Sequence, residues 1–268
     1  MKLFFGKISA FIFLLLLTIV IIEIILKNPI SDPLLEYQNN KIEKETIINT
    51  VFFGDSSCGN SIDVRDMDPN TYNLSLTGDY NLSNTLRILE RTYEKHPELE
   101  KVYIMHSFDV FSRMDSGILN ININSLNYFE RVYYKIQALK YVLTIRPFVT
   151  LKIDLANDFL KQNKKHILNE KSLILDNQIS FDNKNSLIGI KNFCNKNDLK
   201  YLFLFGPSIK VIKNENYNSI INFFRTNKIN FIEDYFELNE INIGDGIDHV
   251  APDFKDESTK FYKALIGI

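Results

Sequence analysis

The sequence predicts an α/β protein: a doubly wound parallel sheet of about five strands with flanking helices, preceded by one N-terminal transmembrane helix. Three observations lead to this prediction. Short, β-rich apolar runs alternate with helical stretches, which implies βαβ units with parallel strands and helices on both faces of the sheet. A long apolar run lies near the N-terminus. The chain has 268 residues, 45% hydrophobic and 24% charged, the composition of a packed globular protein.

The apolar run covers residues 8–26, and its 19 residues would span about 28 Å as a helix, close to the hydrocarbon thickness of a bilayer. No small-residue cleavage site follows it, so residues 1–27 are predicted to be an uncleaved signal anchor. Lys2 and Lys7 precede the run and are expected to stay cytoplasmic. We therefore expect a single-pass membrane protein whose C-terminal domain is exported to the periplasmic or extracellular side.

Residues 28–45 contain two prolines and many polar groups, which is typical of a linker, and residues 46–268 form the predicted α/β domain. The segment 108–200 is too long for one crossover, so we expect a helical insertion that covers a site or docks on the membrane. Strands are predicted at 47–53, 72–76, 102–105, 201–205 and 231–236, and helices at 81–95, 186–195, 217–227 and 252–265.

Charge and cysteine content exclude several classes of function. The 31 basic and 33 acidic residues give a net charge of -2, so there is no overall basic field for nucleic acid, and no nucleic-acid partner is expected. The two cysteines, Cys58 and Cys194, are too few for a disulfide scaffold and lack the paired spacing of a zinc site. No cofactor and no bound metal are predicted.

A candidate nucleophile follows the first predicted strand, where the chain reads Gly54-Asp55-Ser56. Ligands of an open parallel sheet bind outside the carboxyl ends of its strands, so Ser56 lies where a reacting group is expected. A serine becomes nucleophilic when a base removes its proton. The best base among the four histidines is His249, which precedes the last predicted helix and has Asp245 and Asp248 close by to orient its imidazole.

The other histidines and the nearby cysteine have simpler interpretations. His96 lies in a surface-like Lys-His-Pro, His166 lies in a polar run, and His106 is expected to pack at the end of a strand. Cys58 follows Ser56 closely, but no base is visible beside it, which favours a small buried helix residue.

These motifs resemble the SGNH, or GDSL, hydrolase family: Gly-Asp-Ser-Ser after a strand, Gly78 in the loop after the second strand, and an Asp/His pair before the terminal helix. The resemblance implies an SGNH/flavodoxin-like fold with Ser56 as nucleophile. It also implies an oxyanion hole formed by the Ser56 backbone N–H, Gly78 and a residue of the third block. That block reads His-Ser-Phe-Asp instead of Gly-x-Asn-Asp, so Ser107 or Asp109 is the provisional third donor.

The last block also departs from the family pattern, because Asp-x-x-His would place its aspartate at Gly246. We predict that Asp245 orients His249, since it can fold back across the glycine, with Asp248 as the alternative. The anchor and the Asp-His-Val-x-Pro ending resemble membrane-tethered relatives associated with cell-surface polysaccharides. That resemblance implies acyl esters of glycans as substrates.

The leading expectation is therefore a membrane-anchored serine esterase or O-acyltransferase that acts on acyl esters of envelope glycans. Transfer is slightly favoured, because the insertion could exclude water from the cleft. The alternative is a catalytically degenerate anchored module that binds glycan or an envelope-assembly partner, which the missing asparagine favours. A third, more distant hypothesis is a metal-dependent phosphoesterase that uses Asp245, Asp248 and His249.

Overall fold

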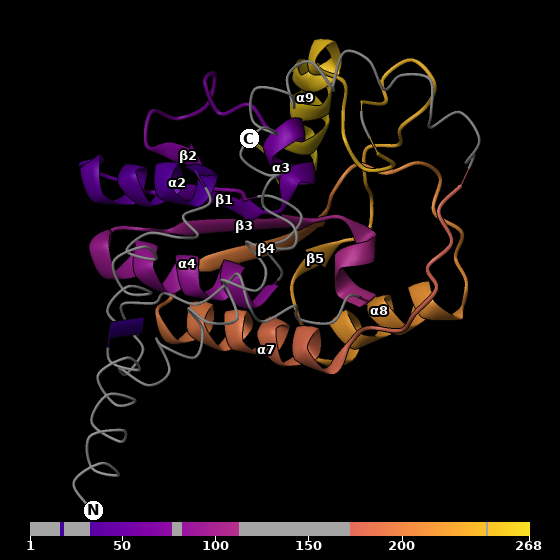
Figure 1. Cartoon of the computed structure of the whole chain (residues 1–268), viewed down its shortest axis with the longest axis horizontal. Helices are drawn as coiled ribbons and strands as arrows, with labels where there is room; N and C mark the ends of the chain where they lie inside the picture. Colours follow the sequence, from indigo (N-terminus) through magenta and orange to yellow (C-terminus); the bar gives the residue numbers. More distant parts are fainter. Residues whose placement is uncertain (1–16, 19–32, 77–81, 113–171, 245) are drawn as a thin grey trace, which may run out of the picture. The chain divides into compact units, whose positions relative to one another are not determined.

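The computed structural model describes residues 17–18, 33–76, 82–112, 172–244 and 246–268. From residue 33 onward, the described residues belong to one compact unit. Its centre is a five-stranded parallel sheet with the strand order β2-β1-β3-β4-β5 (Figure 1), which confirms the predicted α/β class and the parallel pairing. The strands are β1 (Thr50–Gly54), β2 (Thr71–Asn73), β3 (Lys101–His106), β4 (Lys200–Phe205) and β5 (Phe231–Ile232).

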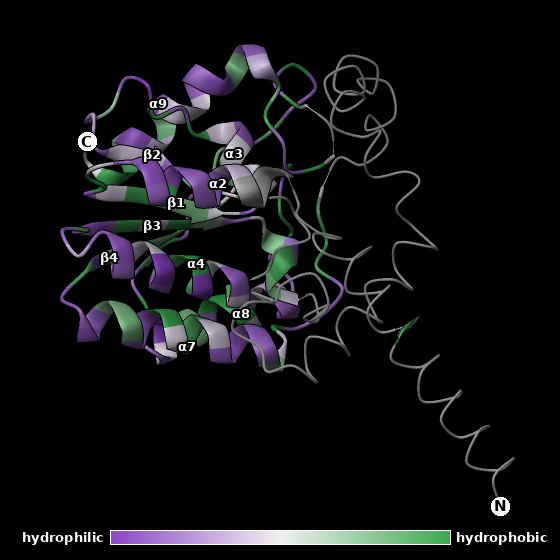
Figure 2. Cartoon of the chain, turned by 60° about the vertical axis from the view of Figure 1, so that its left-hand side comes forward, coloured by the Kyte–Doolittle hydropathy of each residue, from purple (hydrophilic) through white to green (hydrophobic). Residues whose placement is uncertain are grey.

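Helices cover both faces of the sheet, as a doubly wound fold requires. In Figure 2, α3 and α9 lie on one side of the strands, and α4, α7 and α8 lie on the other. The α-helices described are α2 (Pro33–Lys44), α3 (Ser56–Ser61), α4 (Leu82–Lys95), α7 (Phe181–Lys196), α8 (Glu215–Thr226) and α9 (Lys255–Ile266). Two short 3-10 helices, η1 (Phe108–Ser112) and η5 (Pro252–Phe254), are also present.

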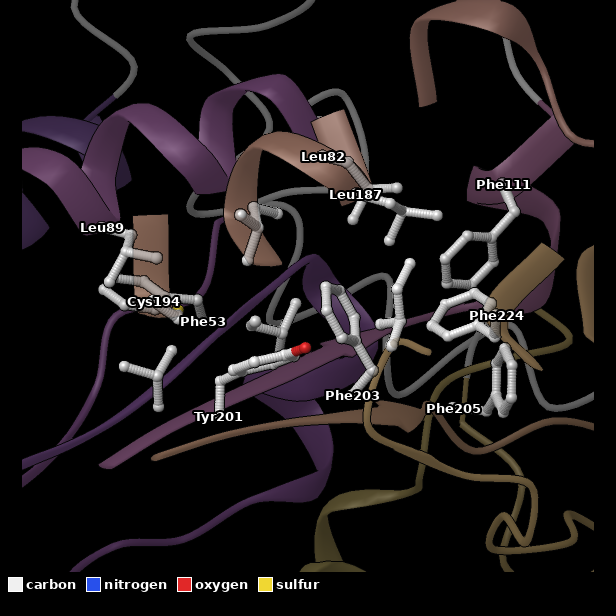
Figure 3. Close-up of a cluster of buried hydrophobic side chains, with 14 of the residues drawn as sticks. Phe53, Leu82, Leu89, Phe111, Leu187, Cys194, Tyr201, Phe203, Phe205 and Phe224 are labelled. Carbon is white, nitrogen blue, oxygen red and sulfur yellow. The ribbon is translucent and has the colours of Figure 1, made fainter. Parts of the chain in front are cut away.

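The core is divided by the sheet, because successive side chains of a strand point to opposite faces. Val51 and Phe53 join the larger cluster beneath α4, α7 and α8, whereas Phe52 between them joins the cluster beneath α3 and α9. Aromatic rings fill much of the larger cluster (Figure 3), where Phe205 and Phe224 lie 5.8 Å apart between ring centroids. The sheet is therefore buried on both faces.

The two cysteines lie on opposite faces of this sheet. Cys58 belongs to the cluster beneath α3 and α9, and Cys194 belongs to the cluster beneath α4 and α7. Both are free and buried, and burial raises the pKa of both thiols. They form no disulfide with each other, and neither has the lowered pKa of a reactive thiol.

The strand order creates a switch point between β1 and β3. The chain runs from β1 to β2 on one side and then crosses to β3 on the other, so the loops after β1 and β3 diverge at the carboxyl edge. Gly54 and Met105 are paired at this edge, and a Cβ on Gly54 would lie 1.8 Å from the Met105 carbonyl oxygen. Ligands of open α/β sheets bind at such a point.

The structure of residues 33–44 differs from the linker that is predicted for the segment 28–45. Residues 33–44 of the segment 28–45 form α2, which packs against α4 and buries Gln38 and Ile42. An Arg91–Glu43 ion pair of 2.9 Å joins the two helices. The buried positions are four apart and so share one helical face, a spacing that the proline and polar content of the segment concealed.

The predicted insertion 108–200 is described only at its two ends, residues 108–112 and 172–200. Both of its described ends belong to the α/β domain, because Phe111 of η1 and Leu187 of α7 are buried in the larger core cluster. The remainder, residues 113–171, lies outside the described residues, and so does the predicted anchor apart from Leu17 and Thr18. Within the described ranges, no helix has the length and apolar character that a membrane crossing requires.

Candidate active site

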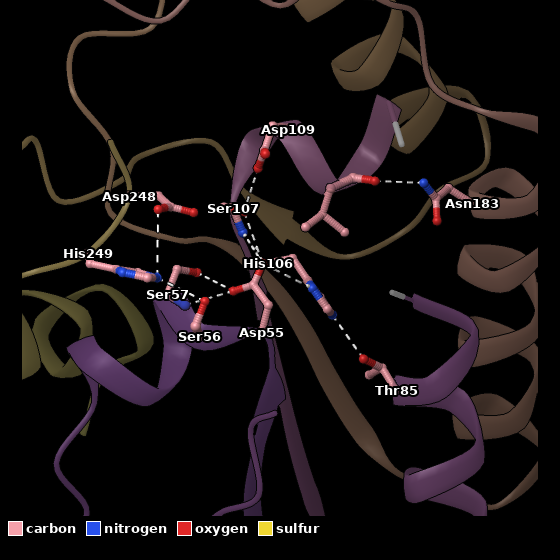
Figure 4. A network of polar contacts seen from close by, with 11 residues as sticks. Asp55, Ser56, Ser57, Thr85, His106, Ser107, Asp109, Asn183, Asp248 and His249 are labelled. Atoms are coloured by element: carbon pink, nitrogen blue, oxygen red, sulfur yellow. Dashed lines mark hydrogen bonds and ion pairs between the residues drawn. The ribbon is translucent and has the colours of Figure 1, made fainter. Parts of the chain in front are cut away.

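The structure brings Ser56 and His249 together at the switch point. Ser56 Oγ lies 2.8 Å from His249 Nε2, although the two residues are 193 positions apart in the chain (Figure 4). Ser56 is the first residue of α3, directly after β1, and both side chains are half-buried. A neutral imidazole with a free electron pair on Nε2 accepts the serine proton in this geometry, which is the contact that an activated serine needs.

His249 is held in place by a small hairpin of the chain. The Gly244 backbone N–H donates to the His249 carbonyl at 2.7 Å, and the Ala251 N–H donates to the Asn242 carbonyl at 2.8 Å. Gly246, at the turn, has φ +71°, in the left-handed region that glycine adopts without strain. The histidine is therefore positioned by backbone contacts on both sides.

Asp248 lies beside His249 on the side that faces Ser56. Its Oδ1 is 3.7 Å from His249 Nε2, the nitrogen that contacts the serine. Burial raises the pKa of Asp248 to about 6; His249 opposes this shift, whereas the charges on Asp55 and Asp109 add to it. In a serine–histidine–aspartate triad the aspartate contacts the other ring nitrogen, Nδ1. Asp245 lies outside the described residues, so its role as the orienting carboxylate stays a prediction.

Asp55 is a buried carboxylate that joins two loops of the site. Its Oδ1 accepts from the Ser57 backbone N–H at 2.9 Å and from the Ser57 hydroxyl at 2.5 Å. Its Oδ2 accepts from the backbone N–H and the hydroxyl of Ser107, both at 3.0 Å. Burial opposes ionisation, but contacts with His106, Ser57 and Ser107 outweigh it and hold the pKa of Asp55 well below its usual range.

His106 extends this network into the core. It is buried at the end of β3, its Nδ1 lies 3.5 Å from Asp55 Oδ2, and its Nε2 lies 2.9 Å from the Thr85 hydroxyl of α4. The expectation of a packed strand-end histidine is confirmed. The contacts of His106 with Asp55 were not predicted, and the only signal for them is that polar residues follow two strands that prove to be neighbours.

The provisional oxyanion donor, Ser107, directs its hydrogens to carboxylates. Its backbone N–H donates to Asp55, and its hydroxyl lies 3.0 Å from Asp55 and 2.6 Å from Asp109 Oδ1. To serve an oxyanion, the Ser107 hydroxyl would have to turn away from both. Gly78 lies outside the described residues. The Ser56 N–H is in the first turn of α3, where helix N–H groups lack an intrahelical acceptor. The composition of the oxyanion hole therefore stays a prediction.

Gly206, directly after β4, supports the site in a way that sequence reasoning missed. A Cβ at this position would lie 2.3 Å from the Ser57 hydroxyl oxygen. The Gly206 N–H also donates to the His106 carbonyl at 2.9 Å. Gly-Pro-Ser at this point of the sequence is most simply a turn, with lining of the cleft as a second interpretation; neither predicts the close approach of Gly206 to Ser57.

The remaining candidates lie elsewhere. His96 is not on the surface as expected: it is buried, and its Nε2 lies 2.7 Å from the Ile42 carbonyl of α2. His166 is outside the described residues. In the part of the chain that the structure describes, no three His, Cys, Asp or Glu side chains are grouped so that they could hold a metal ion.

No protein-family model and no curated protein matches this chain. The fold and the site alone define its class: a doubly wound α/β protein with a serine–histidine pair at the carboxyl edge of a five-stranded parallel sheet.

Proposed function

We propose that this chain is a membrane-anchored serine esterase or O-acyltransferase of the SGNH type, acting on acyl esters of envelope glycans. The observation that carries the proposal is the 2.8 Å contact between Ser56 Oγ and His249 Nε2 at the switch point of the sheet. The strand order and the position of Gly-Asp-Ser at the end of β1 agree with that family's arrangement. The exported location and the glycan substrate rest on the predicted anchor and on the resemblance alone.

The reaction follows from the pair. His249 Nε2 takes the Ser56 proton while Oγ forms a bond to the acyl carbonyl carbon. The ester C–O bond then breaks, and the departing alcohol takes the proton from His249. Water or a sugar hydroxyl resolves the acyl-enzyme by the reverse sequence, which gives hydrolysis with water and transfer with the sugar.

One observation favours the second candidate, a degenerate module that binds glycan or an envelope-assembly partner. Both hydrogen-bond donors of Ser107, its backbone N–H and its hydroxyl, face carboxylates. In this arrangement Ser107 cannot donate a hydrogen bond to an oxyanion. An acyl transfer site loses about 10²–10³ in rate for one missing oxyanion donor. A module of this kind would keep the fold and lack the activity.

A fluorophosphonate probe distinguishes the two candidates. The full-length chain, in its membranes, is treated with the probe between pH 6 and pH 9, beside Ser56→Ala and His249→Ala variants. We expect an adduct that peptide mass spectrometry places on Ser56 rather than on its neighbour Ser57, and that both variants lose. Labelling of the unaltered chain no greater than that of Ser56→Ala would leave the binding module as the better proposal.

A further inference from the structure

Asp248 lies on the substrate side of the His249 imidazole. Its carboxylate oxygen is 3.7 Å from Nε2, the nitrogen that is 2.8 Å from Ser56 Oγ (Figure 4). An orienting aspartate would contact Nδ1, on the far side of the ring from the nucleophile. The position of Asp248 therefore matches a group that meets a reactant rather than one that holds the base.

The reactant that reaches this position is the acyl acceptor, the water or alcohol that attacks the acyl-enzyme. Once Ser56 carries the acyl group, its oxygen has no proton to share with Nε2, and the attacking hydroxyl of the acceptor takes that place. The one hydrogen of this hydroxyl points to Nε2. A second O–H donor next to it would point to Asp248, because two ordinary hydrogen bonds of about 2.8 Å reach from neighbouring donors to atoms 3.7 Å apart.

We propose that Asp248 binds the second O–H donor of the acceptor, so that the site favours acceptors with two adjacent O–H donors over acceptors with a single hydroxyl. A vicinal diol of a sugar and a water molecule both meet this requirement. The inference rests on the proposed function and narrows it.

The proton balance does not require Asp248 to titrate. The attacking hydroxyl gives its proton to His249 Nε2 while its oxygen bonds to the acyl carbon. The bond from that carbon to Ser56 Oγ breaks, and Oγ receives the proton from Nε2. Asp248 accepts a hydrogen bond throughout and remains a carboxylate.

The surroundings of Asp248 suit an acceptor of hydrogen bonds. Its side chain is 20% exposed, so an incoming molecule can reach it. The charged and polar groups that act on it are His249, Ser107, Asp55 and Asp109, and burial raises its pKa to about 6, which leaves it ionised at neutral pH. Hydrogen bonds to an ionised acceptor are roughly twice as strong as those between neutral groups.

The test compares acceptors that differ by one donor. The full-length chain, purified in detergent, is acylated with p-nitrophenyl acetate in the presence of equal amounts of ethylene glycol and 2-methoxyethanol. Acetylated glycol, acetylated methoxyethanol and free acetate are then quantified. We expect two-donor acceptors to be preferred by roughly tenfold over the single hydroxyl, the effect of one hydrogen bond to a charged group.

The preference should depend on Asp248. The two products of two-donor acceptors are acetylated glycol and free acetate. In Asp248→Ala, the ratio of these products to acetylated methoxyethanol is expected to fall by about tenfold. In Asp248→Asn, which keeps the size and a neutral acceptor, it should fall less. Asp253→Ala removes an exposed carboxylate four positions after His249 and should leave the ratio unchanged. A fall confined to acetylated glycol identifies a sugar diol as the acceptor, and a fall confined to acetate identifies water.

Two results would overturn the inference while leaving the proposed function intact. One is a ratio that Asp248→Ala and Asp248→Asn do not change although acylation proceeds. The other is a loss of acylation itself by about 10⁴ in Asp248→Asn, the effect of removing an orienting aspartate. Failure of the unaltered chain to form an acyl-enzyme would overturn the proposed function and this inference together.

Discussion

Asp55 is fully buried and Asp248 is partly buried, yet the pKa values of the two aspartates move in opposite directions. Burial opposes the ionised form of Asp55, but contacts with His106 first, and then hydrogen bonds from Ser57 and Ser107, outweigh it and lower the pKa. For Asp248 burial dominates, and its pKa rises to about 6. The same residue type is therefore held as a buried anion in one place and is partly exposed, with a raised pKa, in the other.

Replacing Asp55 should destabilise the fold. Asp55→Asn keeps the size of the side chain but turns one acceptor oxygen into a donor that meets the hydrogens of Ser57 or Ser107. We expect a loss of about 3 kcal/mol in the free energy of unfolding at pH 7, as for other broken buried charge networks. Thermal unfolding followed by circular dichroism measures it. Asp66→Asn, at an exposed position, is the control, and equal melting temperatures for the two variants would contradict the structural role of Asp55.

Replacing Asp248 should stabilise the fold, the opposite of the effect expected for Asp55. The folded-state pKa, about 6, lies above the ordinary value of 3.8, so the folded chain binds this proton more tightly than the unfolded chain does. Ionised Asp248 thus costs stability above pH 6, and the cost vanishes as the pH falls to about 4. We expect Asp248→Asn to raise the free energy of unfolding at pH 8 by on the order of 2 kcal/mol and to change it little at pH 4. A variant that is less stable than the unaltered chain at pH 8 would contradict this.

At the scale of elements, α9 is fastened to α3 along one face. Lys255 Nζ donates to the Gly59 carbonyl at 2.7 Å. One turn later, the Thr259 hydroxyl donates to the Ser61 carbonyl at 3.0 Å and accepts from the Asp63 N–H at 2.9 Å. Because α3 begins with Ser56 and α9 follows the His249 loop, these bonds help to set the relative position of Ser56 and His249.

Removing these bonds should slow turnover more than it weakens substrate binding. Lys255→Met and Thr259→Val keep the shape of each side chain, and we expect kcat on an activated ester to fall by roughly tenfold to a hundredfold with little change in KM, as for small misplacements of reacting groups. Lys263→Met is the matched control, because Lys263 lies on the same face of α9 but bonds to the Asp66 carbonyl, beyond α3. Equal kinetics for Lys255→Met and Lys263→Met would show that the contact at Gly59 has no positioning role.

Sequence patterns predicted the strands and most helices because each depends on local periodicity. They missed α2, whose buried positions Gln38 and Ile42 are separated by polar residues. In the site, Ser56 and His249 followed from a motif and from the requirement for a base. The hydrogen bonds of Asp55 with Ser107 could not be predicted, because they exist only when β1 and β3 are neighbours, and strand order is a property of the whole sheet.

At the scale of the whole molecule, the orientation across the membrane decides which substrates are available. The predicted anchor, residues 1–27, is expected to place the α/β domain outside the cytoplasm. Protease added to intact cells or spheroplasts should therefore degrade the chain beyond about residue 30 and protect the extreme N-terminus. Lysed cells serve as the control for protease access. Protection of the domain in intact cells would place it in the cytoplasm and remove envelope glycans from consideration.

The 193-residue separation of Ser56 and His249 also has a consequence for biosynthesis. All five strands precede His249 in the chain, so the ribosome has completed the entire sheet before the base is made. A nascent or prematurely terminated chain that ends after β5 carries Ser56 but lacks His249, the histidine that contacts the Ser56 hydroxyl. If the proposed function holds, Ser56 gains its base only after the last loop has been synthesised and has closed over the finished sheet.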